Sequence, residues 1–181
     1  MFLLTVLTIS IFPAIPAAAS GSSQAPHSSD PAKYQAWLTK EVRHELVMLP
    51  YYSVFDNLAF KIDGYRVTLL GQVVRPSTKT EAEARVKKIE GVSSVINQIE
   101  VLPASPMDDQ LRRKLFRAIF SETTLEKYSL QAVPPIHIIV KNGHATLEGV
   151  VESESDKNVA NIRASGVAGV FSVTNNLRVE K

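Results

Sequence analysis

An internal repeat constrains this chain more than any other feature of its sequence. Residues 58–101 align with residues 136–179 without a gap when the sequence is shifted by 78 positions. Of the 44 aligned pairs, 14 are identical. A fixed period kept over such a length indicates a duplicated structural unit. The 181 residues are therefore expected to form two copies of one small unit rather than a single large domain.

Each copy shows the same succession of helical and strand patterns. In the first copy, residues 34–48 carry apolar side chains four positions apart, which is typical of an amphipathic helix. Residues 58–63 and 67–73 alternate apolar and polar positions, as half-buried strands do. A second helix is expected over residues 76–89 and a third strand over residues 95–101. The second copy repeats this order, with a longer connection between its first helix and first strand.

The predicted fold class is α+β, with two tandem α-β-β-α-β units. In each unit, two amphipathic helices can cover one face of a small three-stranded mixed sheet. The predicted organisation is a signal peptide at 1–19, a flexible linker at 20–33, the first domain at 34–102, a short Pro-containing linker at 103–107 and the second domain at 108–181.

The N-terminal segment favours export from the cell. Residues 2–12 are apolar and uncharged, and three alanines at 17–19 follow, as at the cleavage site of a secretory signal. No Lys or Arg precedes the apolar run, which departs from the usual signal. The run is shorter than the ~20 apolar residues that a membrane span needs, so we expect cleavage after Ala19 rather than an uncleaved anchor. The chain has no cysteine, which excludes disulfides, lipidation at a cysteine and thiolate chemistry.

Two short motifs recur in both copies. The first is Val-Thr-Leu-x-Gly-x-Val at residues 67–73, with Ala in place of the first Val at residues 145–151. The second is Gly-Val-x-x-Val-x-Asn-x-x-x-Val, which ends both copies. Together with the order of elements, these motifs resemble the BON domain (bacterial osmotically induced and nodulation) over residues 36–180. The resemblance implies a periplasmic or secreted bacterial envelope protein with no catalytic residues and no cofactor. It further implies phospholipid attachment, envelope integrity under osmotic stress, or accessory and chaperone roles in secretion.

Two repeated residue types in these motifs indicate structural requirements. Asn97 and Asn175 occupy inward positions of the last strand, where an amide must find hydrogen-bond partners and nearby backbone would supply them. Gly71 and Gly149 indicate close backbone approach or positive φ. We expect none of the four to bind a ligand.

One concentrated cluster of basic residues stands on the predicted first helix of the second unit. Arg113 and Arg117 share a helix face, and aromatic side chains flank them. Cations beside aromatic rings suit an anionic lipid surface, at ~1 kcal/mol per basic residue. The predicted lipid-binding residues are Arg112, Arg113, Lys114, Phe116 and Arg117. The alternative is a solvated helix face that two nearby aspartates partly neutralise.

The connection after the first helix is aromatic. Tyr51, Tyr52 and Phe55 suit either an interfacial anchor or the core beneath the first sheet. We favour the core, because Tyr128 recurs at the corresponding place in the second unit.

Strand alternation also predicts an apolar sheet face opposite the helices. An open sheet face in water is normally more polar than this one. We therefore expect these residues to bury against the sister unit or a partner protein. They are Leu70, Val74, Ile96, Ile139 and Val150.

The remaining features narrow the class of function. The balance of 20 basic and 18 acidic residues gives no support for nucleic-acid binding. The histidines lack metal-ligand spacing, and no nucleophile-base motif is present, so neither a metal site nor an enzyme is expected. The sequence thus predicts a non-enzymatic envelope protein that binds membrane phospholipid head groups and supports envelope integrity under osmotic or other stress. The alternative is a periplasmic adaptor or chaperone that binds envelope or secreted proteins through the apolar sheet face.

Overall fold

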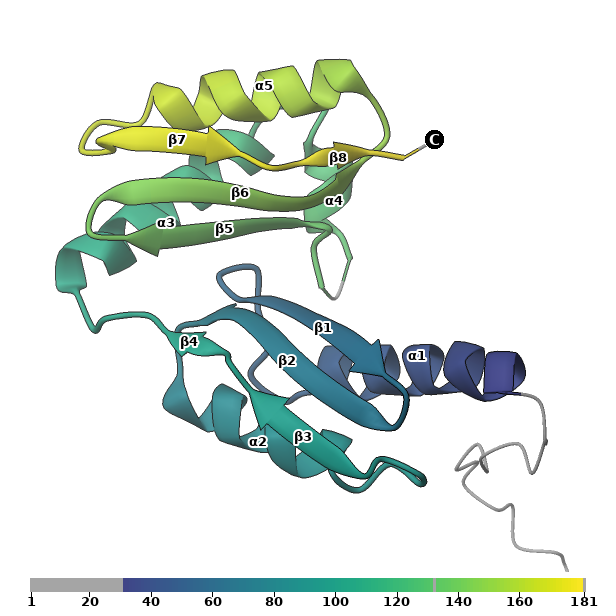
Figure 1. The fold of residues 1–181 in the computed structure, drawn as a ribbon. Coiled ribbons are helices and arrows are strands. Elements are labelled where there is room, and N and C mark those ends of the chain that lie inside the picture. The colour runs from purple at the N-terminus through teal and green to yellow at the C-terminus, as the bar shows by residue number, and fades with distance from the viewer. Residues whose placement is uncertain (1–30, 132, 181) are drawn as a thin grey trace, which may run out of the picture.

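The computed structural model describes residues 31–131 and 133–180, which form two similar units (Figure 1). The first unit contains α1 (Pro31–Val47), β1 (Asn57–Asp63), β2 (Arg66–Val73), α2 (Pro76–Val86), β3 (Ser94–Asn97) and β4 (Glu100–Val101). The second contains α3 (Pro106–Phe120), α4 (Glu126–Ser129), β5 (Ile136–Lys141), β6 (His144–Val151), α5 (Glu154–Ser165), β7 (Ser172–Asn175) and β8 (Arg178–Val179). The predicted signal peptide lies outside the described residues.

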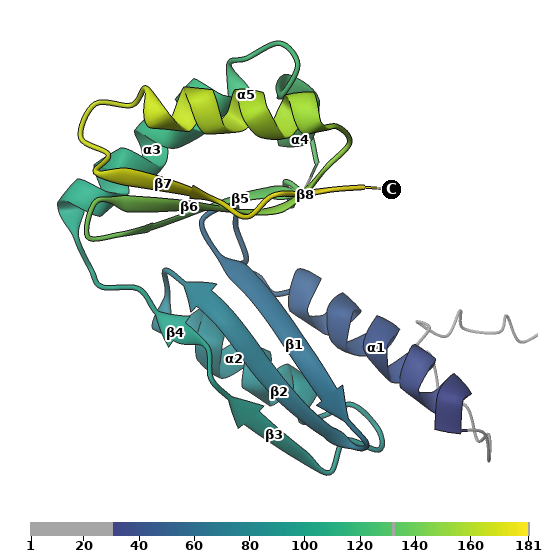
Figure 2. The same ribbon diagram turned by 45° about the horizontal axis from the view of Figure 1, so that its top comes forward.

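Each unit has a small mixed sheet with its long helices on one face. In the first unit β2 is central, antiparallel to β1 and parallel to β3 and β4. In the second unit β6 takes the same place between β5 and the pair β7 and β8. The helices α1 and α2 cover one face of the first sheet, as α3 and α5 cover the second (Figures 1 and 2). The predicted α+β fold with tandem units is confirmed.

The structure adds two details to the predicted order of elements. The short helix α4 occupies the longer connection of the second unit, and the third strand of each unit is divided into two segments. Each strand is divided just after an asparagine, whose side chain, instead of the central strand, accepts the backbone N–H two residues later. Asn97 donates from Nδ2 to the Lys79 carbonyl at 3.0 Å and accepts the Ile99 N–H at 3.2 Å. Asn175 makes the equivalent bonds in the second unit, so the structural role expected for both residues is confirmed.

The core of each unit lies between its sheet and its helices. In the first unit Leu38 and Val42 of α1 are fully buried in one apolar cluster with Leu69 of β2. In the second, Leu115 of α3 packs in the same way against Ile138 of β5. Each such side chain contributes about 1.5–3 kcal/mol relative to an exposed one. The apolar side chains spaced four positions apart in the sequence therefore correctly identify the buried sides of α1 and α3.

A buried carboxylate fixes the hairpin of the second unit. Asp108, in the first turn of α3, accepts the N–H groups of Asn142 and Gly143, both at 2.9 Å. The same helix start is capped by Ser105, whose Oγ accepts the Asp108 N–H. Of the two aspartates expected to neutralise the basic cluster, Asp108 is therefore engaged by backbone N–H groups, whereas Asp109 pairs with Arg112.

Replacing Asp108 by Ala is expected to lower the free energy of unfolding by about 2–4 kcal/mol. The substitution leaves two N–H groups without their acceptor, and hydrogen bonds to charged groups are worth about 1.5–3 kcal/mol each. Urea denaturation of the full chain measures the loss. Gln110→Ala, two positions away on the exposed side of α3, is the matched control and should change stability by less than about 0.5 kcal/mol. Equal stability of the two variants would contradict the role of Asp108.

The connector, residues 48–56 between α1 and β1, joins the two units. The Val54 carbonyl accepts the Ile138 N–H at 2.8 Å, on the outer edge of β5. The Val54 side chain is buried in the core cluster of the second unit, and Phe55 packs against that cluster. The core prediction is thus confirmed for Tyr52, which packs in the first unit, but wrong for Tyr51, which is 50% exposed, and for Phe55, which crosses to the second unit.

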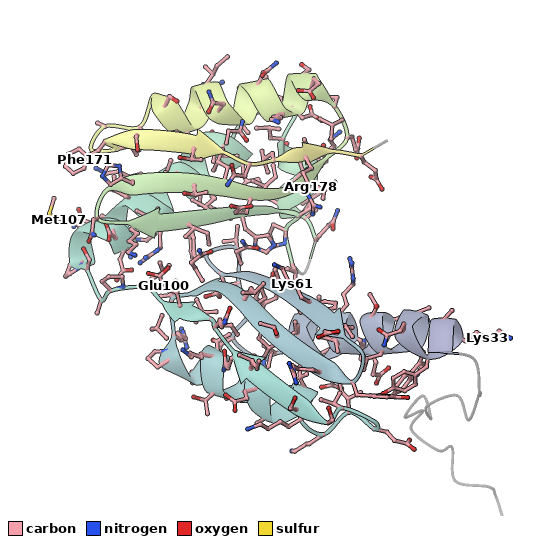
Figure 3. The ribbon with its side chains drawn as sticks, in the orientation of Figure 1. Lys33, Lys61, Glu100, Met107, Phe171 and Arg178 are labelled. Carbon is pink, nitrogen blue, oxygen red and sulfur yellow. The ribbon has the colours of Figure 1, made fainter. Side chains whose placement is uncertain are left out.

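Asp56 holds the connector in this crossing shape. Its carboxylate accepts the N–H and Oγ–H of Ser53 at 2.9 and 2.7 Å and the Val74 N–H at 2.7 Å. The ion pair between Lys141 and Glu100 adds a second, more exposed link between the units, at 2.5 Å. Figure 3 shows Glu100 on the side of the first unit that faces the second.

Candidate lipid-binding face and inter-unit groove

The exposed side of α3 carries most of the predicted lipid-binding residues. Because Leu111 and Leu115 turn toward the sheet, helical geometry places Arg113, Lys114 and Arg117 on the exposed side. None of these three cations has an ion-pair partner within residues 31–131 and 133–180. Phe116 is half-buried among them. We call Arg113, Lys114, Phe116 and Arg117 the basic face.

Arg112 is placed differently from the other predicted residues. Its side chain is only 3% exposed. Nη1 pairs with Asp109 at 2.5 Å, and Nη2 donates to the Val140 carbonyl at 2.7 Å. The Arg112 guanidinium therefore joins α3 to β5, and we leave this residue out of the basic face.

Aromatic rings from both units meet beside the basic face. The Phe116 ring lies 4.8 Å from that of Phe120 and 6.3 Å from that of Phe55, the latter in an edge-on arrangement. A pocket of about 440 Å³ opens there, and its walls are Val54, Phe55, Arg113, Phe116 and Arg117. The pocket is mainly apolar, with the two arginines as its charged groups.

A second, more polar pocket adjoins the first. It has a volume of about 500 Å³ and shares Phe55 and Arg113 with the apolar pocket. Arg75 of the first unit also lines it, with its guanidinium 4.8 Å from the centre of the Tyr51 ring. We call the two connected pockets the inter-unit groove.

The predicted apolar sheet face is divided by the contact between the units. Ile139 is 5% exposed and lies beside Gln72 and Leu102 of the first unit. Leu70, Val74 and Val150 are partly exposed, and Ile96 is 42% exposed. The described structure therefore covers the face at Ile139 and leaves Ile96 accessible.

A buried histidine lies in the contact between the units. The His137 ring lies beside the Tyr52 ring in a tilted arrangement with 5.5 Å between centres, and Nε2 lies 3.4 Å from the tyrosine oxygen. Burial lowers the pKa of His137 below its ordinary value of 6.5, although nearby Asp56 and Glu148 oppose this shift. Burial also raises the pKa of Tyr52 to about 12, so the tyrosine stays a neutral hydroxyl.

We expect His137 to make the folded chain less stable as the pH falls below 6.5. The unfolded chain then binds a proton at this position more readily than the folded chain does, so the free energy of unfolding falls with pH. Above pH 6.5 the His137 contribution is constant. Urea denaturation at roughly pH 5 to 8 should show a steeper decline for the wild type than for His137→Gln. Parallel curves would contradict this expectation.

The other polar clusters serve the fold. The Tyr128 hydroxyl donates to Asp156 at 2.7 Å and accepts the Glu152 N–H at 2.9 Å, which closes the base of α4 against α5. Among residues 31–131 and 133–180, no group of three His, Asp or Glu side chains could hold a metal ion. No helix in the described part of the chain is both long and apolar enough to cross a bilayer.

Comparison with known proteins identifies the repeated unit. Two chains of CdsD, a structural protein of the Type III secretion system of Chlamydia trachomatis, match with 14% and 13% identity and TM-scores of 0.32 and 0.30. The matches cover 80% of this chain and 98% and 93% of those chains, the first being the C-terminal domain of CdsD. No curated protein matches this chain. The family model of the BON domain matches twice, at residues 35–103 and 108–181. BON domains are non-catalytic and are associated with membrane or envelope interactions. This chain belongs to the BON-domain family and carries two BON domains in tandem.

Proposed function

We propose that this protein attaches to membrane surfaces of the bacterial envelope by binding anionic phospholipid head groups, and so supports envelope integrity under osmotic or other stress. The observation that carries the proposal is the basic face, where three exposed cations without an ion pair among the described residues stand on the same helix as a half-buried aromatic ring. Such an arrangement combines electrostatic attraction with a ring that suits the lipid interface.

The expected attachment is weak and reversible. Each basic residue close to an anionic surface contributes ~1 kcal/mol, so three cations supply about 3 kcal/mol. This attraction acts over a Debye length of about 10 Å at 0.1 M salt and is lost at high ionic strength. A peripheral, salt-sensitive association follows, which does not require a membrane-spanning helix.

Vesicle flotation tests the proposal. The full chain is mixed with vesicles of neutral lipid alone or of neutral lipid with phosphatidylglycerol, at low and at high salt. We expect flotation only with phosphatidylglycerol, and we expect salt to reverse it. Flotation that is independent of both lipid charge and salt, or absence of flotation with every lipid, would contradict the proposal.

The open sheet face of the first unit favours a second candidate function, the capture of envelope or secreted proteins by an adaptor or chaperone. Its support is that Ile96 stays exposed, whereas Ile139 of the second unit is covered by protein. The double substitution Leu70→Glu/Ile96→Glu would then abolish a salt-insensitive association with a protein partner. If the variant kept both its stability and its association, the open face would have no such role.

A further inference from the structure

We propose that the inter-unit groove binds one monomeric, single-chain anionic amphiphile, such as a fatty acid or a lysophospholipid, with its tail in the apolar pocket and its acidic group at Arg113. This inference deepens the proposed function, because Arg113 and Arg117 belong to both sites. The two proposals concern different ligands: the groove would bind a single molecule taken from the membrane or from solution, whereas the basic face would bind the surface of a bilayer.

The apolar pocket supplies a site for the tail. Its volume of about 440 Å³ falls within the roughly 300–1,000 Å³ of pockets that bind small molecules. Phe55 and Phe116 form its walls from two different units, and the buried Val54 side chain lies at its inner end. The Val54 hydrogen bond to β5 holds these walls together, so the pocket exists only where both units are joined.

The polar pocket supplies a site for the acidic group. Arg113 stands at the junction of the two pockets, and Arg75 lines the polar one from the first unit. Two carboxylates in the same pocket are already engaged, since Asp109 pairs with Arg112 and Asp56 accepts three hydrogen bonds from the connector and Val74. Four arginines (Arg75, Arg112, Arg113 and Arg117) and two aspartates (Asp56 and Asp109) line the groove, so its net positive charge is complementary to an anion.

The joined pockets favour one chain over a diacyl lipid. The apolar part is one pocket of about 440 Å³ beside the edge-on pair of Phe55 and Phe116, and Arg113 also lines the polar part. A single tail fills the apolar pocket while its head group reaches the arginines. The hydrophobic tail supplies most of the affinity through apolar burial, and the arginines select an acidic head group by charge-assisted hydrogen bonds.

The test is a fluorescence titration of the full chain with dansyl-labelled undecanoic acid below its micelle concentration. We expect saturable binding at one site, displaced by decanoate and much less by decanol. Arg113→Gln should weaken binding about tenfold, because it removes a charge-assisted hydrogen bond. Phe55→Ala should weaken it through loss of the pocket wall. Lys114→Gln, on the same helix but outside the pocket, is the matched control and should bind the probe like the wild type.

Flotation with the same preparations separates the two proposals. Probe binding that is weakened by Arg113→Gln and unchanged by Lys114→Gln supports the groove site. Absence of probe binding by a chain that still floats with anionic vesicles overturns the groove site and leaves the proposed function standing. Equal binding by wild type, Arg113→Gln and Phe55→Ala also overturns it, because the probe would then bind elsewhere. If neither vesicles nor probe bind, both proposals fail.

Discussion

Replacing Arg113 and Arg117 together by glutamate is expected to remove the chain from anionic vesicles. Each substitution changes the local charge by two, so the pair turns an attraction of about 2 kcal/mol into a repulsion of similar size, a change of about 4 kcal/mol or about a thousandfold in affinity. Both side chains are exposed and make no ion pair within the described residues, so the fold should be unaffected. Flotation with phosphatidylglycerol vesicles measures the loss, and circular dichroism checks the fold.

A matched charge reversal on the first unit shows whether the effect is local. Lys87→Glu/Lys88→Glu makes the same change in net charge on exposed residues that follow α2, where it also removes the ion pair of Lys87 with Glu83. We expect this variant to keep most of its vesicle binding. If it loses as much as the α3 variant, binding depends on net charge, and the basic face is not the site.

The substitution Gly149→Ala is expected to lower the free energy of unfolding by about 3 kcal/mol or more. Gly149 has a φ of +124°, which side chains rarely adopt, and an added Cβ would collide with the Pro135 carbonyl oxygen. That oxygen also accepts the Val150 N–H, so the backbone cannot move away without losing a hydrogen bond. Backbone strain of about 1–3 kcal/mol and overpacking of about 1–3 kcal/mol add together here.

Gly166→Ala is the matched control in the same unit. Gly166 follows α5 with an ordinary φ of −79°, and the nearest atom to an added Cβ would be 3.6 Å away. This variant should match the wild type within about 1 kcal/mol. Urea denaturation compares both substitutions, and a Gly149→Ala chain as stable as the control would contradict the close approach of β6 to the start of β5.

Local periodicity explains why the fold itself could be predicted. The spacing of Leu38 and Val42, and of Leu111 and Leu115, identifies which side of α1 and α3 is buried. The alternation in β2 and β6 similarly identifies the covered face of each sheet. Because the sequence repeats, each copy supports the interpretation of the other.

Contacts between the units could not be predicted in the same way. Val54 and Phe55 are followed by a regular strand of the first unit, yet both side chains pack in the second. A hydrogen bond from Ile138 to Val54 joins residues far apart in the sequence, and no periodic pattern encodes it. The pairing of Tyr52 with His137 and the inter-unit groove depend on this crossing, so they become visible only in three dimensions.

Within the basic cluster, the sequence likewise did not predict the position of one residue, Arg112. The sequence presents Arg112 and Arg113 as equivalent neighbours. The helix turns by about 100° per residue, so Arg112 falls against β5 and bonds to the Val140 carbonyl while Arg113 faces outward. The sequence does hold one signal that Arg112 differs from Arg113. Arg112 stands three positions after Asp109, a spacing that suits an ion pair within the helix.

The most direct test of membrane attachment through the basic face is to locate the surface of the protein that touches the bilayer. Lipid nanodiscs with phosphatidylglycerol and a spin-labelled head group would be added to the isotope-labelled chain, and amide signals that broaden by proximity would be recorded. We expect broadening at residues 113–117 of α3 and at residues 51–55 of the connector beside it. Broadening centred on Leu70 and Ile96 of the open sheet face, or no broadening at α3, would contradict it.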